Sequence, residues 1–203
     1  MTIEIINCEQ GTPEWLLARA GIPTASEFST VLAQGKGGGP SKTRRTYMLK
    51  LLGERITGAV VDGYTNAHME RGKAMEDEAR QAYALMTDSD PQRVGFIRNG
   101  EKGCSPDSLI DANGMNEIKT KLPHLQLEVL LSGEVPAEHL PQIQGQLWVA
   151  EREWCDFVSY WPGIRLFVKR VYRDEKYIVE LNAGVRRFLD ELNDLEQQYR
   201  KAA

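Results

Sequence analysis

Cysteine is scarce in this sequence. Its three cysteines, Cys8, Cys104 and Cys155, are odd in number and lie far apart along the 203 residues. There is no C-x-x-C pair, and no histidine stands at zinc-ligand spacing from a cysteine. These absences exclude a disulfide framework and give no support to a zinc or iron–sulfur site.

Long apolar runs are absent as well. None approaches the roughly 18 residues that a membrane-spanning helix requires. The opening MTIEIINCEQ lacks the basic start and apolar centre of a signal peptide. We therefore expect a cytoplasmic protein with no membrane partner.

The chain also has no excess of positive charge. With 25 Lys and Arg against 29 Asp and Glu, its formal net charge is −4. A nucleic-acid partner would therefore have to bind a local basic face. One candidate is KGGGPSKTRR, from Lys36 to Arg45, where four basic residues accompany three consecutive glycines. We interpret it as a mobile basic loop, and two roles stay open for it: contact with DNA phosphates, or plain solvation at the surface.

What is present is the composition of an ordinary globular domain, 41% hydrophobic and 27% charged, which predicts a single domain over residues 1–203. A capping box formed by Thr24 and Glu27 predicts the start of a helix. Asn-Gly pairs at 99–100 and 113–114 predict turns in a strand meander. Further helices are predicted at residues 66–86, from Pro141 onward and around 185–195, and further strands at 155–161 and 164–172. This order predicts an α/β fold with a mixed central sheet flanked by helices.

One predicted hairpin, CSPDSLIDANGMNEIKTK at residues 104–121, carries three charged groups: Asp107, Glu117 and Lys119. Residues two apart on a strand share a face, so Glu117 and Lys119 point the same way. A two-residue turn at 113–114 would place Asp107 on the opposite face.

A three-residue loop at 112–114 gives a different arrangement. It ends in a glycine suited to the left-handed backbone that such loops require, and it pairs Asp111 with Met115. Asp107 then lies opposite Lys119, and all three charged groups share one face. We favour this loop over the two-residue turn.

Charges gathered in a partly buried site need compensation, because each uncompensated one costs several kcal/mol. Lys119 alone cannot offset Asp107, Glu117 and the nearby Glu76, but a divalent cation can. Oxygen ligands without a histidine or cysteine favour Mg²⁺, or Mn²⁺ in its place, over zinc. Such ions suit phosphodiester hydrolysis, since they bind the phosphate and activate an attacking water.

These residues resemble a known signature. The "PD" at 106–107 and "EIK" at 117–119 are similar to the PD-(D/E)xK motif of nucleases with a restriction-endonuclease-like core. The blocks GIPTASEF, RGKAMEDEAR, CSPDSL, EIK and PQIQGQLW also stand in the order found in phage lambda exonuclease and the related YqaJ-like viral recombinases. The resemblance extends from about Trp15 to the "DEKY" at 174–177.

The resemblance implies roles for individual residues. It implies that Asp107, Glu117, Glu76 and the Ile118 carbonyl are metal ligands and that Lys119 is the catalytic lysine. Without the family, Glu76 would be an ordinary glutamate on a helix surface. Gln142 matches an active-site glutamine, but many members carry a tyrosine three or four residues later, where this sequence has Gly145 and Gln146.

The family also binds a 5′-phosphate, in a pocket whose counterparts here are Arg19, Thr24, Ser26 and Ser105. Ser26 would lie in the first turn of a helix, where free N–H groups attract anions, and an arginine can hold a phosphate through two hydrogen bonds. Met69 takes the place of an apolar wedge between the separating strands, although a methionine at helical spacing also fits a core position.

By this resemblance the chain is expected to be a Mg²⁺-dependent exonuclease that degrades duplex DNA ends from 5′ to 3′ and leaves 3′ tails for phage-type recombination in a bacterial host cell. The resemblance also implies that three copies of the chain form a ring and that a single-strand annealing protein is their partner. An endonuclease of restriction or repair type and a catalytically inactive DNA-binding module are the alternatives.

Overall fold

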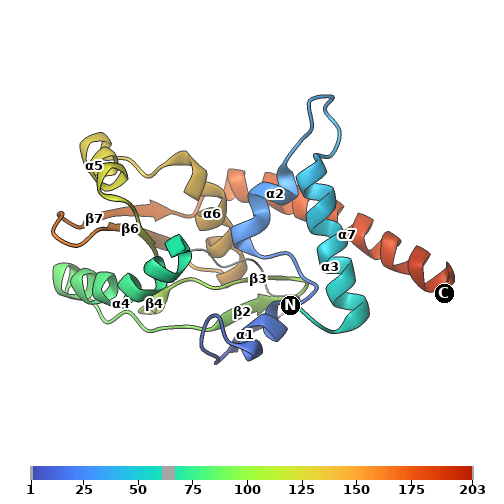
Figure 1. Cartoon of the computed structure of the whole chain (residues 1–203), viewed down its shortest axis with the longest axis horizontal. Helices are drawn as coiled ribbons and strands as arrows, with labels where there is room; N and C mark the ends of the chain where they lie inside the picture. The colour runs from blue at the N-terminus through green and yellow to red at the C-terminus, as the bar shows by residue number, and fades with distance from the viewer. Residues whose placement is uncertain (1, 61–66, 203) are drawn as a thin grey trace.

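The computed structural model describes residues 2–60 and 67–202, apart from the side chains of residues 67–70 and 73. Within these ranges the chain forms two sheets surrounded by helices (Figure 1). Their elements are, in chain order, β1 Ile3–Ile6, α1 Pro13–Arg19, α2 Phe28–Leu32, α3 Lys42–Thr57, α4 Ala67–Thr87, β2 Phe96–Asn99, β3 Lys102–Cys104, β4 Ser108–Ile110, β5 Gly114–Thr120, α5 Pro123–Ser132, α6 Leu140–Ala150, β6 Trp154–Tyr160, β7 Phe167–Tyr172 and α7 Glu175–Ala202.

The larger sheet has the order β4-β5-β6-β7. Its β5 and β6 are parallel and the outer pairs are antiparallel, so the sheet is mixed, as predicted. Alternate residues of β5 face opposite layers: Ile118 packs with Ala79 and Tyr83 of α4, whereas Met115 packs with residues of α6 such as Ile143. The predicted fold class, a mixed sheet flanked by helices, is confirmed.

The smaller sheet, with order β1-β2-β3, lies beside a helical layer made of α2, α3, α6 and α7. Phe28, Met48 and Val149 meet there in one buried cluster. The apolar stripe of α7, from Val185 to Leu195, packs against the same cluster, which explains its periodicity by burial within the chain.

Several predicted elements are confirmed. The helix expected at 66–86 is α4, the helix opened by Pro141 is α6, and the two late strands are β6 and β7. The capping box is wrong, because the Thr24 side chain makes no cap hydrogen bond and the chain there forms a short 3₁₀ turn, Ala25–Glu27, before α2.

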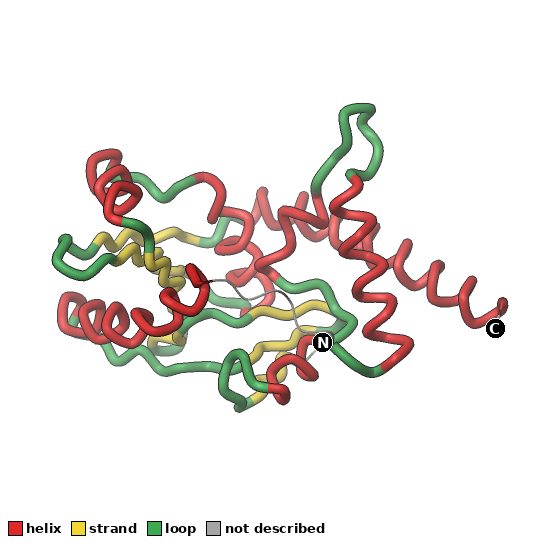
Figure 2. The backbone as a smooth tube through the Cα atoms, viewed as in Figure 1, coloured by secondary structure: helices red, strands yellow, loops and turns green. Residues whose placement is uncertain are grey.

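The basic segment at 36–45 is only partly a loop. Figure 2 shows the connection between α2 and α3 projecting from the body of the molecule, and Lys36 is exposed there. Arg45 is also exposed but belongs to α3, which begins at Lys42. Arg44 is buried and makes two hydrogen bonds, 2.6 and 2.9 Å long, to the Glu191 carboxylate of α7, so it fastens two helices together.

The hairpin register differs from both turns considered in the sequence. Leu109 pairs with Met115 and Ile110 with Gly114, so the loop is Asp111–Asn113, and Asp111 is the residue with left-handed backbone (φ 48°). The expected pairing of Asp111 with Met115 is therefore wrong. Gly114 is required for another reason, because a Cβ there would collide with the Trp154 ring.

Candidate active site

The charged groups of the hairpin converge at the start of β4 and along β5. The true register is shifted by two residues from the expected one, and a shift by an even number leaves every side chain on its expected face. The Ile118 N–H donates a hydrogen bond to the Asp107 carboxylate, and the Asp107 N–H donates to the Asn116 carbonyl (3.2 Å). The Nζ of Lys119 lies 2.6 Å from Glu117 Oε1.

Glu117 is the buried member of this group, with only 3% of its surface exposed. Two glutamines of α6 donate to its two oxygens: Gln142 Nε2 to Oε1 at 2.6 Å and Gln146 Nε2 to Oε2 at 2.6 Å. Gln142 also accepts a hydrogen bond from Lys119 Nζ at 3.3 Å. Gln146 was not identified as a site residue from the sequence. Its signal was two glutamines four residues apart, which places both on one face of a helix.

Glu76 approaches from α4, on the other side of Asp107. It forms a very short ion pair with Arg80, whose guanidinium also donates to the Ser108 hydroxyl (2.9 Å) and to the Asp107 carbonyl (3.3 Å). Arg80 is buried and was not identified from the sequence. It ties the helix that carries Glu76 to the strand that follows Asp107.

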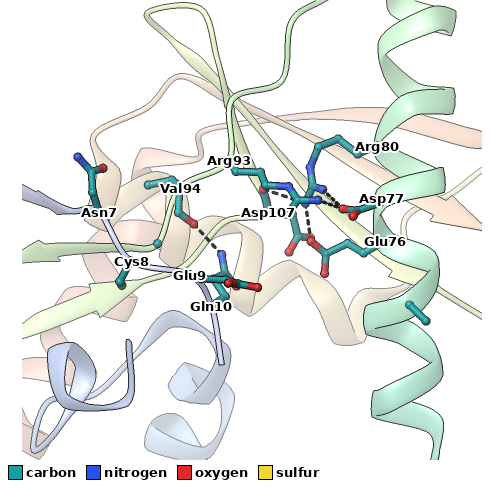
Figure 3. A pocket seen from close by; sticks show the side chains of 12 residues that line it. Asn7, Cys8, Glu9, Gln10, Glu76, Asp77, Arg80, Arg93, Val94 and Asp107 are labelled. Atoms are coloured by element: carbon teal, nitrogen blue, oxygen red, sulfur yellow. Dashed lines mark hydrogen bonds and ion pairs between the residues drawn. The ribbon is translucent and has the colours of Figure 1, made fainter. Parts of the chain in front are cut away.

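A cavity of about 530 Å³ opens beside this group, and Figure 3 shows Glu76, Asp77 and Arg80 of α4 gathered next to Asp107. Both Glu76 and Asp107 line it. Gln10 also lines it and donates hydrogen bonds to the carbonyls of Val94 (2.9 Å) and Pro106 (3.0 Å). The N-terminal segment therefore holds the loop that carries the Pro-Asp dipeptide.

The electrostatics of the group are those of crowded carboxylates. Burial raises the pKa of Asp107 well above its ordinary value, and the negative charges of Glu117 and Glu76 raise it further, while Lys119 opposes them. Burial alone would lower the pKa of Lys119, but Glu117 and Asp107 outweigh it, so this pKa is raised and the amine stays protonated. Lys119 and Arg80 supply two positive charges against the three carboxylates Asp107, Glu117 and Glu76, so an excess of negative charge remains.

The donor chemistry of this cluster suits a hard divalent cation. Asp107, Glu117, Glu76 and the Ile118 carbonyl offer oxygen atoms alone, which Mg²⁺ and Mn²⁺ prefer. Yet among the residues that the structure describes, no three His, Cys, Asp or Glu side chains are arranged to hold a metal ion. The reason is visible in their contacts: Glu76 is turned to Arg80, and Glu117 to its lysine and glutamines.

A second polar cluster contains the four residues expected to bind a phosphate. Arg19 Nη2 donates to the Thr24 hydroxyl at 3.1 Å, which lies 3.3 Å from the Ser26 hydroxyl. The fourth residue, Ser105, is linked to the other three through Trp15. The Nε1–H of Trp15 donates to Ser105 Oγ at 2.8 Å, and its ring lies 4.3 Å beneath the Arg19 guanidinium. Trp15 was not expected in this role.

The second cluster adjoins the first through the chain itself. Ser105 is two residues from Asp107, and two residues of backbone span at most about 7 Å. Burial lowers the pKa of Arg19, although this guanidinium stays charged at any working pH. A half-buried cation that is hydrogen-bonded to a hydroxyl group therefore lies near the carboxylate cluster.

Two further sequence candidates lie outside these clusters. Met69 belongs to α4, but its side chain is outside the described residues. Lys36 and Arg45 are exposed, and neither makes a contact with the site residues among the hydrogen bonds and ion pairs of the described chain. No helix in the described part of the chain is long and apolar enough to cross a membrane.

The comparisons with known proteins agree with this arrangement. Two solved structures superpose closely: LHK-Exo in complex with dAMP (TM-score 0.85, 34% identity, covering 94% of this chain and 98% of that one) and an alkaline exonuclease, LHK-Exo, from Laribacter hongkongensis (TM-score 0.84, 33% identity, 94% and 97%). A phage-related exonuclease from Haemophilus somnus 129PT shares the fold at 13% identity (TM-score 0.65, 90% and 96%). No curated protein sequence matches significantly.

Fold and site together define a nuclease with the PD-(D/E)xK core. Residues 14–153 match the YqaJ-like viral recombinase domain, and the chain belongs to that family.

The crowding of carboxylates predicts that the cluster destabilises the metal-free chain. Where folding raises the pKa of an acid, the free energy of unfolding falls as the pH rises above the ordinary pKa of that acid, which is 3.8 for Asp107. Asp107→Asn should therefore raise the melting temperature at neutral pH without metal by about 2–4 °C, on the order of 1 kcal/mol. It should also abolish any stabilisation by added Mg²⁺. Thermal unfolding measures both effects, with Asp190→Asn at an exposed position of α7 as control. A lower melting temperature for Asp107→Asn would contradict this account.

Proposed function

We propose that the chain is a Mg²⁺-dependent exonuclease that digests double-stranded DNA ends from 5′ to 3′ and leaves 3′ single-stranded tails for phage-type recombination. The observation that carries this proposal is the adjacency of the two clusters. A cationic hydroxyl-lined site suited to a terminal phosphate lies within two residues of a carboxylate–lysine centre suited to hydrolysis. One site to recognise an end beside one to cut the chain is what an exonuclease needs.

In this proposal Asp107, Glu117, Glu76 and the Ile118 carbonyl hold the divalent cation, and Mn²⁺ can replace Mg²⁺. When bound, the cation polarises the scissile phosphate and lowers the pKa of the attacking water. The glutamines of α6 fix the carboxylate of Glu117. Glu76 must leave Arg80 to complete the ligand set, so the Glu76–Arg80 pair is a resting arrangement.

Lys119 acts on the reacting groups, and Gln142 positions it. Lys119 is protonated and only partly exposed, so it can hold the attacking water or neutralise the charge that develops on the phosphate. Gln142 accepts from Lys119 and thereby restricts where the amine points. These are proposed as the catalytic lysine and its positioning partner.

Arg19, Thr24, Ser26 and Ser105 are proposed to bind the 5′-phosphate. The arginine offers two parallel donors, and the hydroxyls supply further hydrogen bonds. Trp15 fixes both the guanidinium, by stacking, and the Ser105 hydroxyl, by its hydrogen bond. Met69 on α4 is proposed as the residue that separates the strands.

The proposed reaction is tested with linear, 5′-phosphorylated duplex DNA, with and without Mg²⁺. Progressive release of nucleotides that needs Mg²⁺ is expected, whereas a covalently closed circle should stay intact. Lys119→Met should lower the rate by at least about 10²-fold, the usual scale for the loss of one group that stabilises charge in the transition state. Lys169→Met, on β7, is the matched control and should keep wild-type activity. Cleavage of the circle would favour an endonuclease, and inactivity on both substrates would favour a DNA-binding module.

Polarity is tested separately, because the hydrolytic centre does not distinguish the two ends of a strand. A hydrogen bond to a charged group is worth roughly 1.5–3 kcal/mol, so Arg19→Ala should slow digestion of 5′-phosphorylated ends about tenfold or more. Ends with a 5′-hydroxyl do not engage the cluster and should lose far less. Arg98→Ala, an exposed arginine of β2, serves as control. Equal losses on both kinds of end would remove the phosphate-binding role.

We also propose that the chain acts as a single domain, in a ring of three copies around DNA, with a single-strand annealing protein as partner in the cytoplasm of a bacterial host. The support is family membership alone, since the stripe of α7 is buried within its own chain. Light scattering, with and without such a partner, measures the mass. Three times the chain's 22.9 kDa is expected, and a monomer at micromolar concentration would contradict the ring.

A further inference from the structure

Gln146 of α6 is a buried polar residue to which the resemblance to the family assigns no role. It is 1% exposed, and its Nε2 donates to Glu117 Oε2 at 2.6 Å. The Oε1 of the same side chain is buried and has no hydrogen-bond partner among the residues that the structure describes. An unpaired amide oxygen costs stability, so packing alone would favour an apolar residue here.

The position of Gln146 is set by its neighbour in α6. Gly145 lies directly against Phe28, and a Cβ at 145 would collide with the Phe28 ring. Because each residue turns a helix by about 100°, this contact fixes which way the next side chain points. Gln146 is thereby aimed at the sheet, four residues after Gln142 and on the same face.

The two glutamines hold different atoms of one carboxylate. Gln142 shares Oε1 with Lys119, and both of these side chains are partly exposed. Oε2 has Gln146 as its donor, and that contact is shielded from water. A carboxylate fixed through both oxygens cannot rotate, whereas one fixed through Oε1 alone can turn about its last bond.

We propose that Gln146 is a positioning residue that orients the Glu117 carboxylate for the divalent cation. This inference rests on the proposed function, in which Glu117 is a metal ligand. Residues that hydrogen-bond to metal ligands orient them, and their loss usually weakens metal binding or activity by 10–100-fold. Gln146 touches neither the cation nor DNA and acts through Glu117 alone.

The test compares two buried glutamines of the same helix. Gln146→Met keeps the approximate volume but removes the donor to Oε2. Gln144→Met is the control, since the hydrogen bonds of Gln144 within the described chain go to the backbone of Tyr172 and Asp174 and none goes to Glu117. For both variants we would measure Mg²⁺ affinity by isothermal calorimetry, the melting temperature by thermal unfolding, and the Mg²⁺ dependence of DNA digestion.

For Gln146→Met we expect Mg²⁺ affinity to fall about tenfold or more, with the digestion rate recovering as Mg²⁺ is raised and the KM for DNA unchanged. Gln144→Met should lower the melting temperature and leave Mg²⁺ affinity as in the wild type. If Gln146→Met does not fold, Gln146→Asn, which withdraws the amide by one methylene, should show the same loss.

Wild-type Mg²⁺ affinity in the Gln146 variant would overturn the inference, and so would a rate defect that excess Mg²⁺ does not relieve. Both outcomes leave the proposed function standing if the wild type binds Mg²⁺ and digests DNA ends. A wild-type chain that does neither would instead end the proposed function, and the inference with it.

Discussion

The burial of one carboxylate, that of Glu117, is the constraint on which the arrangement of this molecule depends. A buried charge is tolerated only where donors surround it, and the donors here come from two elements that are distant in sequence. Lys119 lies on the same strand, and the glutamines lie on α6. The placement of α6 against the sheet is therefore as much a matter of polar satisfaction as of apolar packing.

The opposite face of the sheet is organised around an arginine. Arg80 contacts Glu76 on its own helix, the Ser108 hydroxyl on β4 and the Asp107 carbonyl, so α4 is fixed to the strand that begins beside the centre. One helix on each face thus presents polar groups to the same short hairpin. Asp107, Glu117 and Lys119 are close in sequence, but the residues that hold them in place are not. These range from Gln10, which is bonded to Pro106, to Gln146, which is bonded to Glu117.

The sequence predicted which side chains of the hairpin share a face, but not which residues pair across it. The side-chain period of a strand is two, so any even shift leaves Asp107, Glu117 and Lys119 on one face. The true shift depends on the packing of Gly114 against Trp154, which is 40 residues away and invisible to a local turn rule. For the same reason Thr24 looked like a helix cap, when its hydroxyl is instead bonded to Arg19. Arg80 was missed because a buried arginine has no local signature. Gln146 was missed because its spacing from Gln142 predicts a shared helix face but not what that face contacts.

The contacts that assemble the centre also bear on when it can form during synthesis. Gln10 reaches Pro106 across 96 residues, and Arg44 reaches Glu191 across 147. Contacts of such sequence separation form late, because the loops they close cost entropy before they return stability. A growing chain that has emerged only as far as β5 carries the aspartate, glutamate and lysine without the helix that holds them. The carboxylate cluster is therefore complete only after α6 has emerged and packed on the sheet. Under the proposed function, a nascent fragment on the ribosome would have no formed site with which to cut nucleic acid.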